Sequence, residues 1–307
     1  MADLSIDTPI AAAPAKPAAA VRNMMHNPAV MFGGTVILFV LLMGLLAPWL
    51  GTIDPTAINP IARNKVPGAE MTIRTDTGER IKMVARMGTD GLGRDVYSRV
   101  VYGARISLLV GISVALISVA CGLFIGVLAG FFRVLDAIIM RIMDGLMAIP
   151  AILLAIAMVS LFRSSVWTVI VAITVPQVPG VVRLVRSIVL SVREEPYVEA
   201  AVTLGTSTPK LLWRHVLPNT IAPMIVQGTF ICASAILIEA ILSFLGIGVP
   251  PEVPTWGNIM AVGREVFSLF PHNIIYPGRC LAMTILAVNI LGDGLRDTLD
   301  PKMAKRV

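Results

Sequence analysis

The 307-residue chain is poor in charge. Only 14% of its residues are charged, whereas a soluble globular protein carries roughly a quarter, and 56% are hydrophobic. This composition excludes an ordinary water-exposed surface and predicts a polytopic membrane protein whose apolar side chains face lipid or other spans. The net charge of +6 is then typical of basic residues beside membrane spans, so we do not expect nucleic-acid binding.

Cysteine and histidine are also scarce. The three cysteines form no CxxC pair, and the three histidines are dispersed along the chain. No HExxH or serine–lysine constellation is present, and no Gly-Lys-Ser/Thr follows a glycine-rich turn. We therefore expect no metal, no cofactor, no catalytic residue and no nucleotide site on this chain. The cysteines are interpreted as small buried apolar residues.

Long apolar runs, in contrast, are abundant and predict six spans. Each run is long enough, or nearly so, to cross a hydrocarbon core of ~30 Å at a rise of about 1.5 Å per residue. The runs lie at residues 29–50, 106–131, 138–162, 166–189, 220–245 and 275–292. The predicted fold class is therefore all-α, a multi-pass bundle of six transmembrane helices. An even number of spans places both termini on one side.

The segments around these runs have different compositions. We expect a disordered tail at residues 1–28 and a first, uncleaved span at 29–50. A polar outer segment follows at 51–105. The five-helix core, which includes the loop 190–219, is expected at 106–292 and a second tail at 293–307. Val96, Val100 and Val101 favour a helix lying on the membrane surface before the second span. Outside 51–105, lysine and arginine are concentrated on the side of the N-terminus, which indicates that both termini and the loop 190–219 are cytoplasmic.

A polar stretch, residues 194–219, separates the fourth and fifth runs and carries helix start and stop signals. Pro196 can open a short helix, and Gly205 can end it in a left-handed conformation. Pro209 can open a second helix, which we expect to end at Pro218 before the next span. The prediction is a helix, a sharp glycine turn and a second helix, all outside the bilayer.

Two places inside the spans are candidates for lining a solute pathway. The fourth run contains Pro176, Gln177, Pro179 and Gly180, and two prolines should kink or break its helix. The fifth run contains Glu239, and an acid at the centre of a span costs about 2.5–3.5 kcal/mol on insertion scales. Its side chain should face protein or water. A functional role and a structural hydrogen bond are both open.

Two further patterns favour packing over solute binding. Gly122, Gly126 and Gly130 repeat at every fourth position, which lets two helix backbones approach closely within the bundle. Arg141 and Asp144 are three residues apart on one predicted helix, where a local ion pair is favoured over a contact with a solute.

The loop also resembles that of a known family. Between two spans it carries Glu-Ala-Ala, then glycine, then Leu-Pro, at the spacing of the "EAA" loop in permease subunits of bacterial ABC importers. The matching residues are Glu199, Ala200, Ala201, Gly205, Leu217 and Pro218. In that family the loop forms a helix that enters a groove of a separate ATPase subunit, a helix-in-groove mode of recognition. The resemblance implies that these residues couple the chain to an ATPase.

Three other stretches extend the resemblance over residues 88–301. Residues 88–109 are similar to the "GTDxxGRDxxSRxxxGxRxSL" segment of C-type permeases in the peptide and nickel class. Residues 243–258 and 292–301 are similar to the family's outer proline-rich segment and its C-terminal segment. Residues 268–280 depart from the family, because Arg279 stands where an apolar start to the last span is usual.

The resemblance implies the fold of a type I ABC importer permease in a bacterial inner membrane, in contact with lipid. The implied partners are a second permease subunit, two ATPase subunits and an external substrate-binding protein. The implied cargo is a dipeptide or oligopeptide, with nickel or another small solute as the alternative. An ion-coupled secondary transporter is a more distant alternative, because the sequence shows no convincing internal repeat and few charges within the spans.

Overall fold

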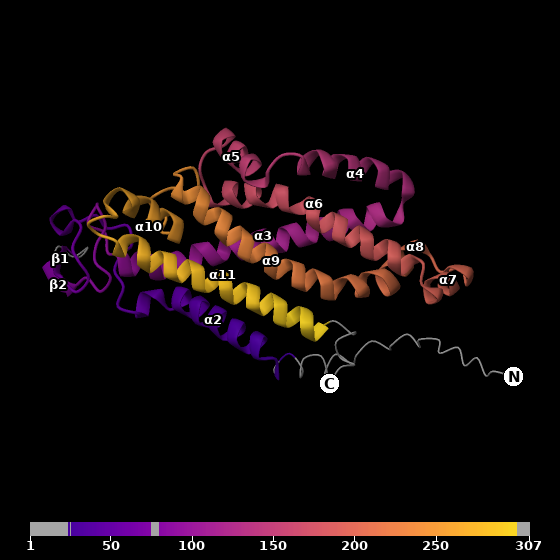
Figure 1. Cartoon of the computed structure of the whole chain (residues 1–307), viewed down its shortest axis with the longest axis horizontal. Coiled ribbons are helices and arrows are strands. Elements are labelled where there is room, and N and C mark those ends of the chain that lie inside the picture. The colour runs from indigo at the N-terminus through magenta and orange to yellow at the C-terminus, as the bar shows by residue number, and fades with distance from the viewer. Residues whose placement is uncertain (1–23, 25, 75–79, 300–307) are drawn as a thin grey trace.

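Long helices run side by side through the molecule (Figure 1). The computed structural model describes residues 24, 26–74 and 80–299. The helices are α2 (Pro28–Leu45), α3 (Val96–Phe131), α4 (Arg133–Met147), α5 (Ala151–Leu161), α6 (Val166–Arg193), α7 (Pro196–Thr203), α8 (Thr208–Leu211), α9 (Leu217–Phe244), α10 (Trp256–Gly263) and α11 (His272–Leu299). Five helical segments are long and apolar enough to cross a membrane, or six spans if a bent pair of helices counts as one. The predicted fold class, an α-helical multi-pass bundle, is confirmed.

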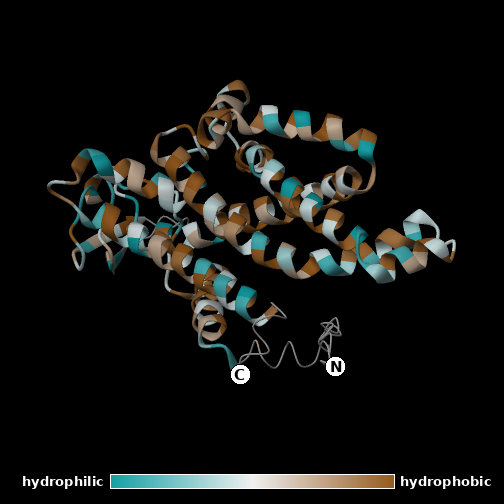
Figure 2. Ribbon diagram, turned by 45° about the vertical axis from the view of Figure 1, so that its right-hand side comes forward, coloured by the Kyte–Doolittle hydropathy of each residue, from teal (hydrophilic) through white to brown (hydrophobic). Residues whose placement is uncertain are grey.

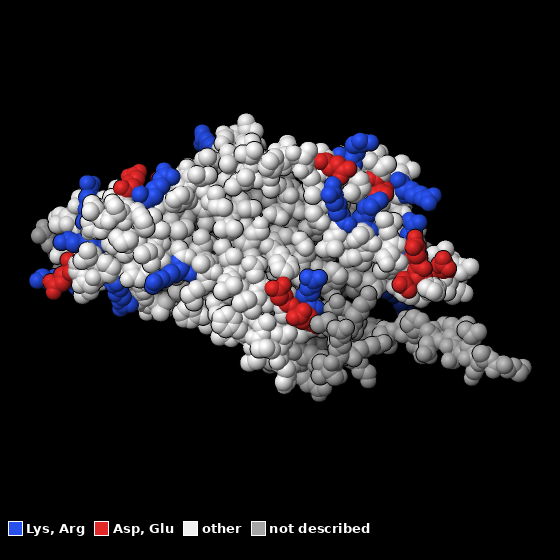
Figure 3. All heavy atoms as spheres, in the orientation of Figure 1, with Lys and Arg blue, Asp and Glu red and all other residues white. Residues whose placement is uncertain are grey.

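The distribution of charge agrees with a bundle that spans a membrane. Hydrophobic residues predominate along the long helices (Figure 2). Most charged side chains on the visible face gather toward the two ends of the long axis, and a broad band between them carries few (Figure 3). The long axis of the bundle is therefore the direction in which it crosses the bilayer.

The first and last helices place both ends of the described chain on one side. α2 packs along α11, and the side-chain amide of Asn27 donates to the carbonyl of Gly294 at 3.4 Å. This end of the bundle is the one from which α7 and α8 project (Figure 1). α11 extends through Leu299, so the predicted tail 293–307 begins as helix. Most of the predicted tail 1–28, and residues 300–307, lie outside the described residues.

The expected surface helix before the second span is not a separate element. Residues 96–105 are the first turns of α3, which continues without interruption for 36 residues. Val96, Val100 and Val101 are 0%, 1% and 2% exposed. The indole Nε1 of Trp256 on α10 donates to the carbonyl of Val100 at 3.0 Å, so protein covers the valines that we expected to face lipid.

The third predicted span, residues 138–162, is two helices. α4 and α5 meet at an angle of 86° across a short break. Pro150 lies in this break, and it lacks an N–H and disfavours the helical conformation at Ile149. α5 then packs on α6 through Ala155 and Val159, which are buried.

The fourth span, in contrast, does not break. The sequence predicted a kink or a break, and of these the break is wrong, because α6 is continuous over 28 residues with Pro176 and Pro179 inside it. Close packing against α3 supports it, because the glycines of α3 face valines of α6. The facing pairs are Gly122–Val181, Gly126–Val185 and Gly130–Val189. The prediction that this glycine stripe serves packing within the bundle is confirmed.

The opposite end of the bundle carries the polar segment between α2 and α3. Two short strands, β1 (Glu70–Arg74) and β2 (Arg80–Val84), pair antiparallel, with Met71 opposite Met83. They cover a small cluster with Ala62 and Ala85, next to short single turns at Ala47–Trp49 and Pro60–Ala62. α10 and a turn at Arg264–Val266 lie at this same end (Figure 1).

Candidate functional site

The short helix α7 holds the Glu-Ala-Ala motif and divides it between two environments. Pro196 begins the helix, as its missing N–H allows. Val198 and Ala201 are 1% and 9% exposed and belong to the same hydrophobic cluster as the end of α6. Glu199 and Ala200 are exposed. One face of α7 therefore anchors it to the bundle, and the other is open.

Gly205 ends α7 in the conformation that the sequence predicts. Its φ is +77°, and its N–H donates to the carbonyl of Val202 at 2.9 Å. The N–H of Thr206 donates to the carbonyl of Ala201 at 3.1 Å. This pair of bonds is the Schellman arrangement, in which a left-handed residue satisfies the last carbonyls of a helix. The left-handed turn at Gly205 is confirmed.

The second helix of the loop does not stop at Pro218, so that expectation is wrong. α8 leads through a π-helical turn, Leu212–Val216, directly into α9, and Pro218 lies in the first turn of α9. A missing N–H is tolerated in a first turn, and the wider π-helical turn provides the junction. Asn219 reinforces it, because its amide donates to the carbonyl of His215 at 2.6 Å. The helix from α8 to α9 is thus one extended unit.

A second contact of Asn219 ties α7 to this unit. The Asn219 amide also donates to the hydroxyl of Tyr197 at 3.2 Å. The rings of Tyr197 and His215 lie with their centroids 6.0 Å apart. α7 is therefore held by both α6 and the start of α9, and a push on α7 acts on two long helices.

The open surface of the loop includes large apolar side chains, which the sequence analysis did not predict. Leu204 and Trp213 are 86% and 77% exposed, and Val202 and Tyr197 are about half exposed. Acidic side chains lie beside them on the same projecting end. These are Glu194, Glu195 and Glu199. Apolar side chains exposed beyond the spans indicate a protein-binding surface. The signal in the sequence was the presence of large apolar residues in an otherwise polar loop.

Glu239 lies inside the protein. Its side chain is fully buried in α9, where the hydroxyl of Ser243 donates to Oε1 at 2.7 Å. The hydroxyl of Ser107 on α3 donates to Oε2 at 3.4 Å. Of the two roles that the sequence left open, this geometry is that of a structural hydrogen-bond network between α3 and α9.

The residues around the α6 prolines point in different directions. Pro179 is buried, and Gln177 is half-buried with its amide 3.3 Å from the hydroxyl of Ser234 on α9. Pro176 is half-buried, and Gly180 is exposed with nothing within 4 Å of a Cβ placed on it. Of this group, therefore, only Gly180 is fully on the open face of α6, and Pro176 and Gln177 lie at its edge.

Two ion pairs between α4 and α6 were not expected. Nη2 of Arg183 donates to Oδ1 of Asp144 at 2.6 Å, and Nη2 of Arg186 donates to Oδ2 of Asp136 at 2.7 Å. The expected local pair between Arg141 and Asp144 is wrong, because Asp144 reaches across to α6 instead. Acidic residues in the third run and arginines in the fourth were the available signal.

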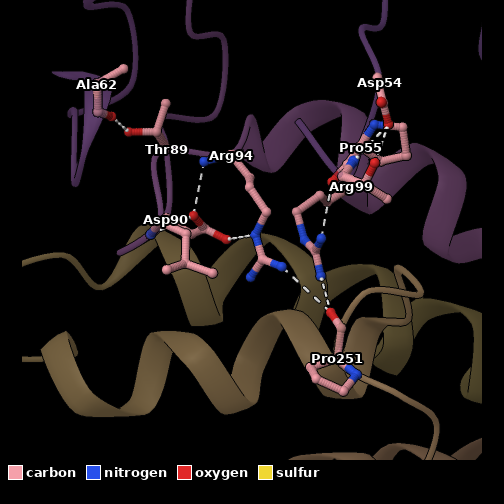
Figure 4. Close-up of polar contacts among 10 residues, drawn as sticks. Asp54, Pro55, Ala62, Thr89, Asp90, Arg94, Arg99 and Pro251 are labelled. Carbon is pink, nitrogen blue, oxygen red and sulfur yellow. Dashed lines mark hydrogen bonds and ion pairs between the residues drawn. The ribbon is translucent and has the colours of Figure 1, made fainter. Parts of the chain in front are cut away.

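The end of the bundle opposite α7 is held by buried arginines from the 88–109 segment (Figure 4). Nε of Arg94 donates to Oδ2 of Asp90 at 2.6 Å, with both side chains at most 5% exposed. Arg99, also buried, donates to the carbonyls of Pro55 at 2.9 Å and Pro251 at 3.3 Å. Arg94 reaches the same Pro251 carbonyl at 3.4 Å. These contacts join the outer segment to the loop after α9 and serve its structure.

The remaining sequence departure, Arg279, lies on the surface. It is exposed in α11, two turns after the helix begins at His272. Its side chain has no hydrogen bond or ion pair with another described residue. The start of α11 at His272 is three residues earlier than the boundary expected from hydropathy.

Comparisons with known proteins agree with this arrangement. Residues 18–67 match the N-terminal transmembrane domain of oligopeptide transport permease C. A probable peptide ABC transporter permease protein of Sinorhizobium fredii is 51% identical, over 93% of each chain. The dipeptide transport system permease protein DppC of Alkalihalophilus pseudofirmus is 37% identical, over 92% of this chain and 89% of that protein. The oligopeptide transport system permease protein OppC of Bacillus subtilis is 33% identical, over 93% of this chain and 90% of that protein.

The second family match covers more than half of the chain and contains the loop, α9 and α11. Residues 122–305 match the binding-protein-dependent transport system inner membrane component. The fold agrees, with its apolar helices and a loop that projects between two of them. The chain belongs to this family of inner-membrane transport components, and it is a multi-pass membrane protein.

Proposed function

We propose that this chain is one permease subunit of an ATP-driven importer that moves peptides through the inner membrane. Relatives named for peptide, dipeptide and oligopeptide transport share 33–51% identity with it over at least 92% of its length. The observation that carries the proposal is the shaped loop that projects from the bundle. Its helix is anchored on one face and exposes apolar and acidic side chains on the other.

The partners follow from what the chain does not carry. The sequence has no nucleotide-binding motif, so ATP hydrolysis belongs to separate subunits. α7 fits the helix-in-groove mode of recognition, with Glu199 and Ala200 on its open face. The complete importer would hold a second permease subunit, two ATPase subunits and an external binding protein that delivers the peptide.

The loop is built to transmit motion from an ATPase to the spans. Val198 and Ala201 fix α7 to the end of α6, and Asn219 joins it to the start of α9. An ATPase that moves α7 would therefore move α6 and α9 together. α6 in turn packs along α3 through the glycine stripe, so the displacement reaches the centre of the bundle.

Reconstitution tests this function directly. The chain, its partner permease, both ATPase subunits and the binding protein are assembled in liposomes, and uptake of a radiolabelled dipeptide and tripeptide is measured. We expect uptake that requires ATP, the binding protein and this chain. The purified chain alone should hydrolyse no ATP. ATP-dependent uptake of Ni²⁺ without uptake of either peptide would refute the peptide assignment. ATP hydrolysis by the chain alone would refute the proposal that separate subunits hydrolyse ATP.

A further inference from the structure

Between positions 176 and 187, one face of α6 carries small or polar residues. Positions 176, 180, 183 and 187 follow the spacing that places residues on a single helix face. Gly180, Arg183 and Ser187 are exposed, and Pro176 is half-buried. A Cβ placed on Gly180 would meet open space. We call this set the α6 polar stripe.

α4 carries a matching stripe and, beside it, an apolar one. Positions 137, 141, 144 and 148 share a face, and all four are exposed. They are Ala137, Arg141 and Asp144 of α4 and Ala148, which directly follows its last residue; we call this set the α4 polar stripe. On the neighbouring face, Ile138 and Ile142 are 57% and 55% exposed. A single helix thus presents one face suited to lipid and another that is not.

The Arg183–Asp144 ion pair joins the two stripes in the last turn of α4 and in the middle of α6. Asp144 lies 11 residues from Arg133, and Arg183 lies 10 residues from Arg193, which is about 15 Å along each axis. That distance is roughly half of the ~30 Å hydrocarbon core. The pair remains open, with 44% of the Arg183 side chain and 56% of the Asp144 side chain exposed. Acidic and basic atoms lie together over α4 in Figure 3.

Charges at this depth do not face lipid readily. Ionisable groups within spans usually face the bundle interior or a water-filled cavity, because hydrocarbon does not solvate them. On α3, in contrast, the exposed side chains include large apolar ones, such as Leu116 at 66% and Phe124 at 69%. The α4–α6 face therefore differs from the lipid-compatible faces of the same bundle.

Arg141 gives this face an uncompensated positive charge. Asp144 is neutralised by Arg183, and Asp136 by Arg186. Arg141 is exposed and has no hydrogen bond or ion pair with another described residue. A guanidinium group binds carboxylates with two parallel hydrogen bonds. A peptide with a free C-terminus carries such a carboxylate whatever its side chains are.

We propose that the α4 and α6 polar stripes line the solute pathway, and that Arg141 receives the carboxylate of the passing cargo. The assignment of a peptide as the cargo rests on the proposed function. The location of the pathway rests on the two stripes alone. The site is exposed, and Arg141 is the one cation of the two stripes without a partner among the described residues. Both properties suit brief binding, since conduction requires that the cargo is also released.

The first test asks which face of α4 meets water. In a chain with Cys121, Cys232 and Cys280 replaced by serine, single cysteines are placed at Ala137, Ala148 and Ser187, and at Ile138 and Ile142 as controls. The assembled importer in vesicles is treated with a charged, impermeant methanethiosulfonate reagent. We expect the polar-stripe cysteines to react at least tenfold faster than the controls, since the reagent and the thiolate both require water. Equal rates, or protection of the polar-stripe cysteines by partner subunits, would overturn the pathway assignment.

The second test asks whether charge at position 141 acts on the cargo. Arg141→Cys in the same background is modified with an ethylammonium reagent or with a sulfonatoethyl reagent, which differ in charge sign at one site. We expect a several-fold loss of dipeptide uptake in the unmodified variant, recovery with the positive adduct and none with the negative adduct. Co-purification of the ATPase subunits should not change. Equal uptake with both adducts, or full uptake by Arg141→Gln, would overturn the role of Arg141.

The two failures can be told apart. If the importer with the unaltered chain takes up no peptide, the proposed function fails, and the labelling test still locates the aqueous face. If it takes up peptide but the adducts do not differ, only the role of Arg141 fails.

Discussion

A Cβ atom placed on Gly126 of α3 would lie 2.6 Å from the Cβ of Val185 on α6. No real pair of Cβ atoms is that close, so the contact requires a glycine on α3. The same contact repeats one turn away on either side, at Gly122–Val181 and Gly130–Val189. Together the three glycines let the two helix backbones approach closely. α3 and α6 also share the hydrophobic cluster that contains Val127 and Val185.

We therefore expect Gly126→Leu to destabilise the bundle by about 1–3 kcal/mol, because added volume in a packed contact forces the helices apart. Thermal unfolding in detergent measures the effect. Gly34→Leu is the matched control, since a Cβ at Gly34 on α2 has nothing within 4 Å. Equal unfolding temperatures for the two variants would contradict the importance of this contact.

A second prediction concerns the buried pair Asp90–Arg94, at the end of the bundle opposite α7. Arg94→Gln leaves the Asp90 carboxylate buried without its cation, and breaking a buried pair in this way costs about 3–5 kcal/mol. The double variant Asp90→Asn/Arg94→Gln removes the stranded charge, so it should be more stable than Arg94→Gln alone. The double-mutant cycle compares the unfolding of the unaltered chain, Asp90→Asn, Arg94→Gln and the double variant. Additive losses would mean that the two side chains do not act as a pair.

The sequence predicted best where a backbone rule leaves little choice. Gly205 was expected in a left-handed turn because only glycine adopts that conformation without strain, and the structure agrees. The stripe at Gly122, Gly126 and Gly130 was likewise assigned to packing from its spacing alone. Local rules of this kind need no knowledge of the partner element.

The sequence predicted poorly where a distant element decides. Val96 and Val100 were assigned to a lipid-facing helix, and Trp256, more than 150 residues away, covers them. Asp144 was paired with its helical neighbour, but Arg183 on α6 competes more successfully. Hydropathy gives the length of an apolar run, and it does not say which neighbour lies against each face.

The last prediction concerns Gly205 and the link to the ATPase. Its φ of +77° strains any residue with a Cβ by about 1 kcal/mol or more, although nothing lies within 4 Å of that Cβ. The strain is therefore conformational and not steric, and it falls on the turn that sets the direction of α7.

Gly205→Val should leave the spans inserted, because the loop lies outside them. It should weaken binding of the ATPase about fivefold for each ~1 kcal/mol of binding free energy that is lost when α7 is misplaced. It should also abolish most transport. Gly205→Asn is the control that separates conformation from mutation as such, since asparagine tolerates the left-handed region and should retain most activity. Co-purification of the ATPase and peptide uptake are measured for both variants. If Gly205→Val keeps full association and full uptake, α7 does not need this turn, and the loop is a passive connector between α6 and α9.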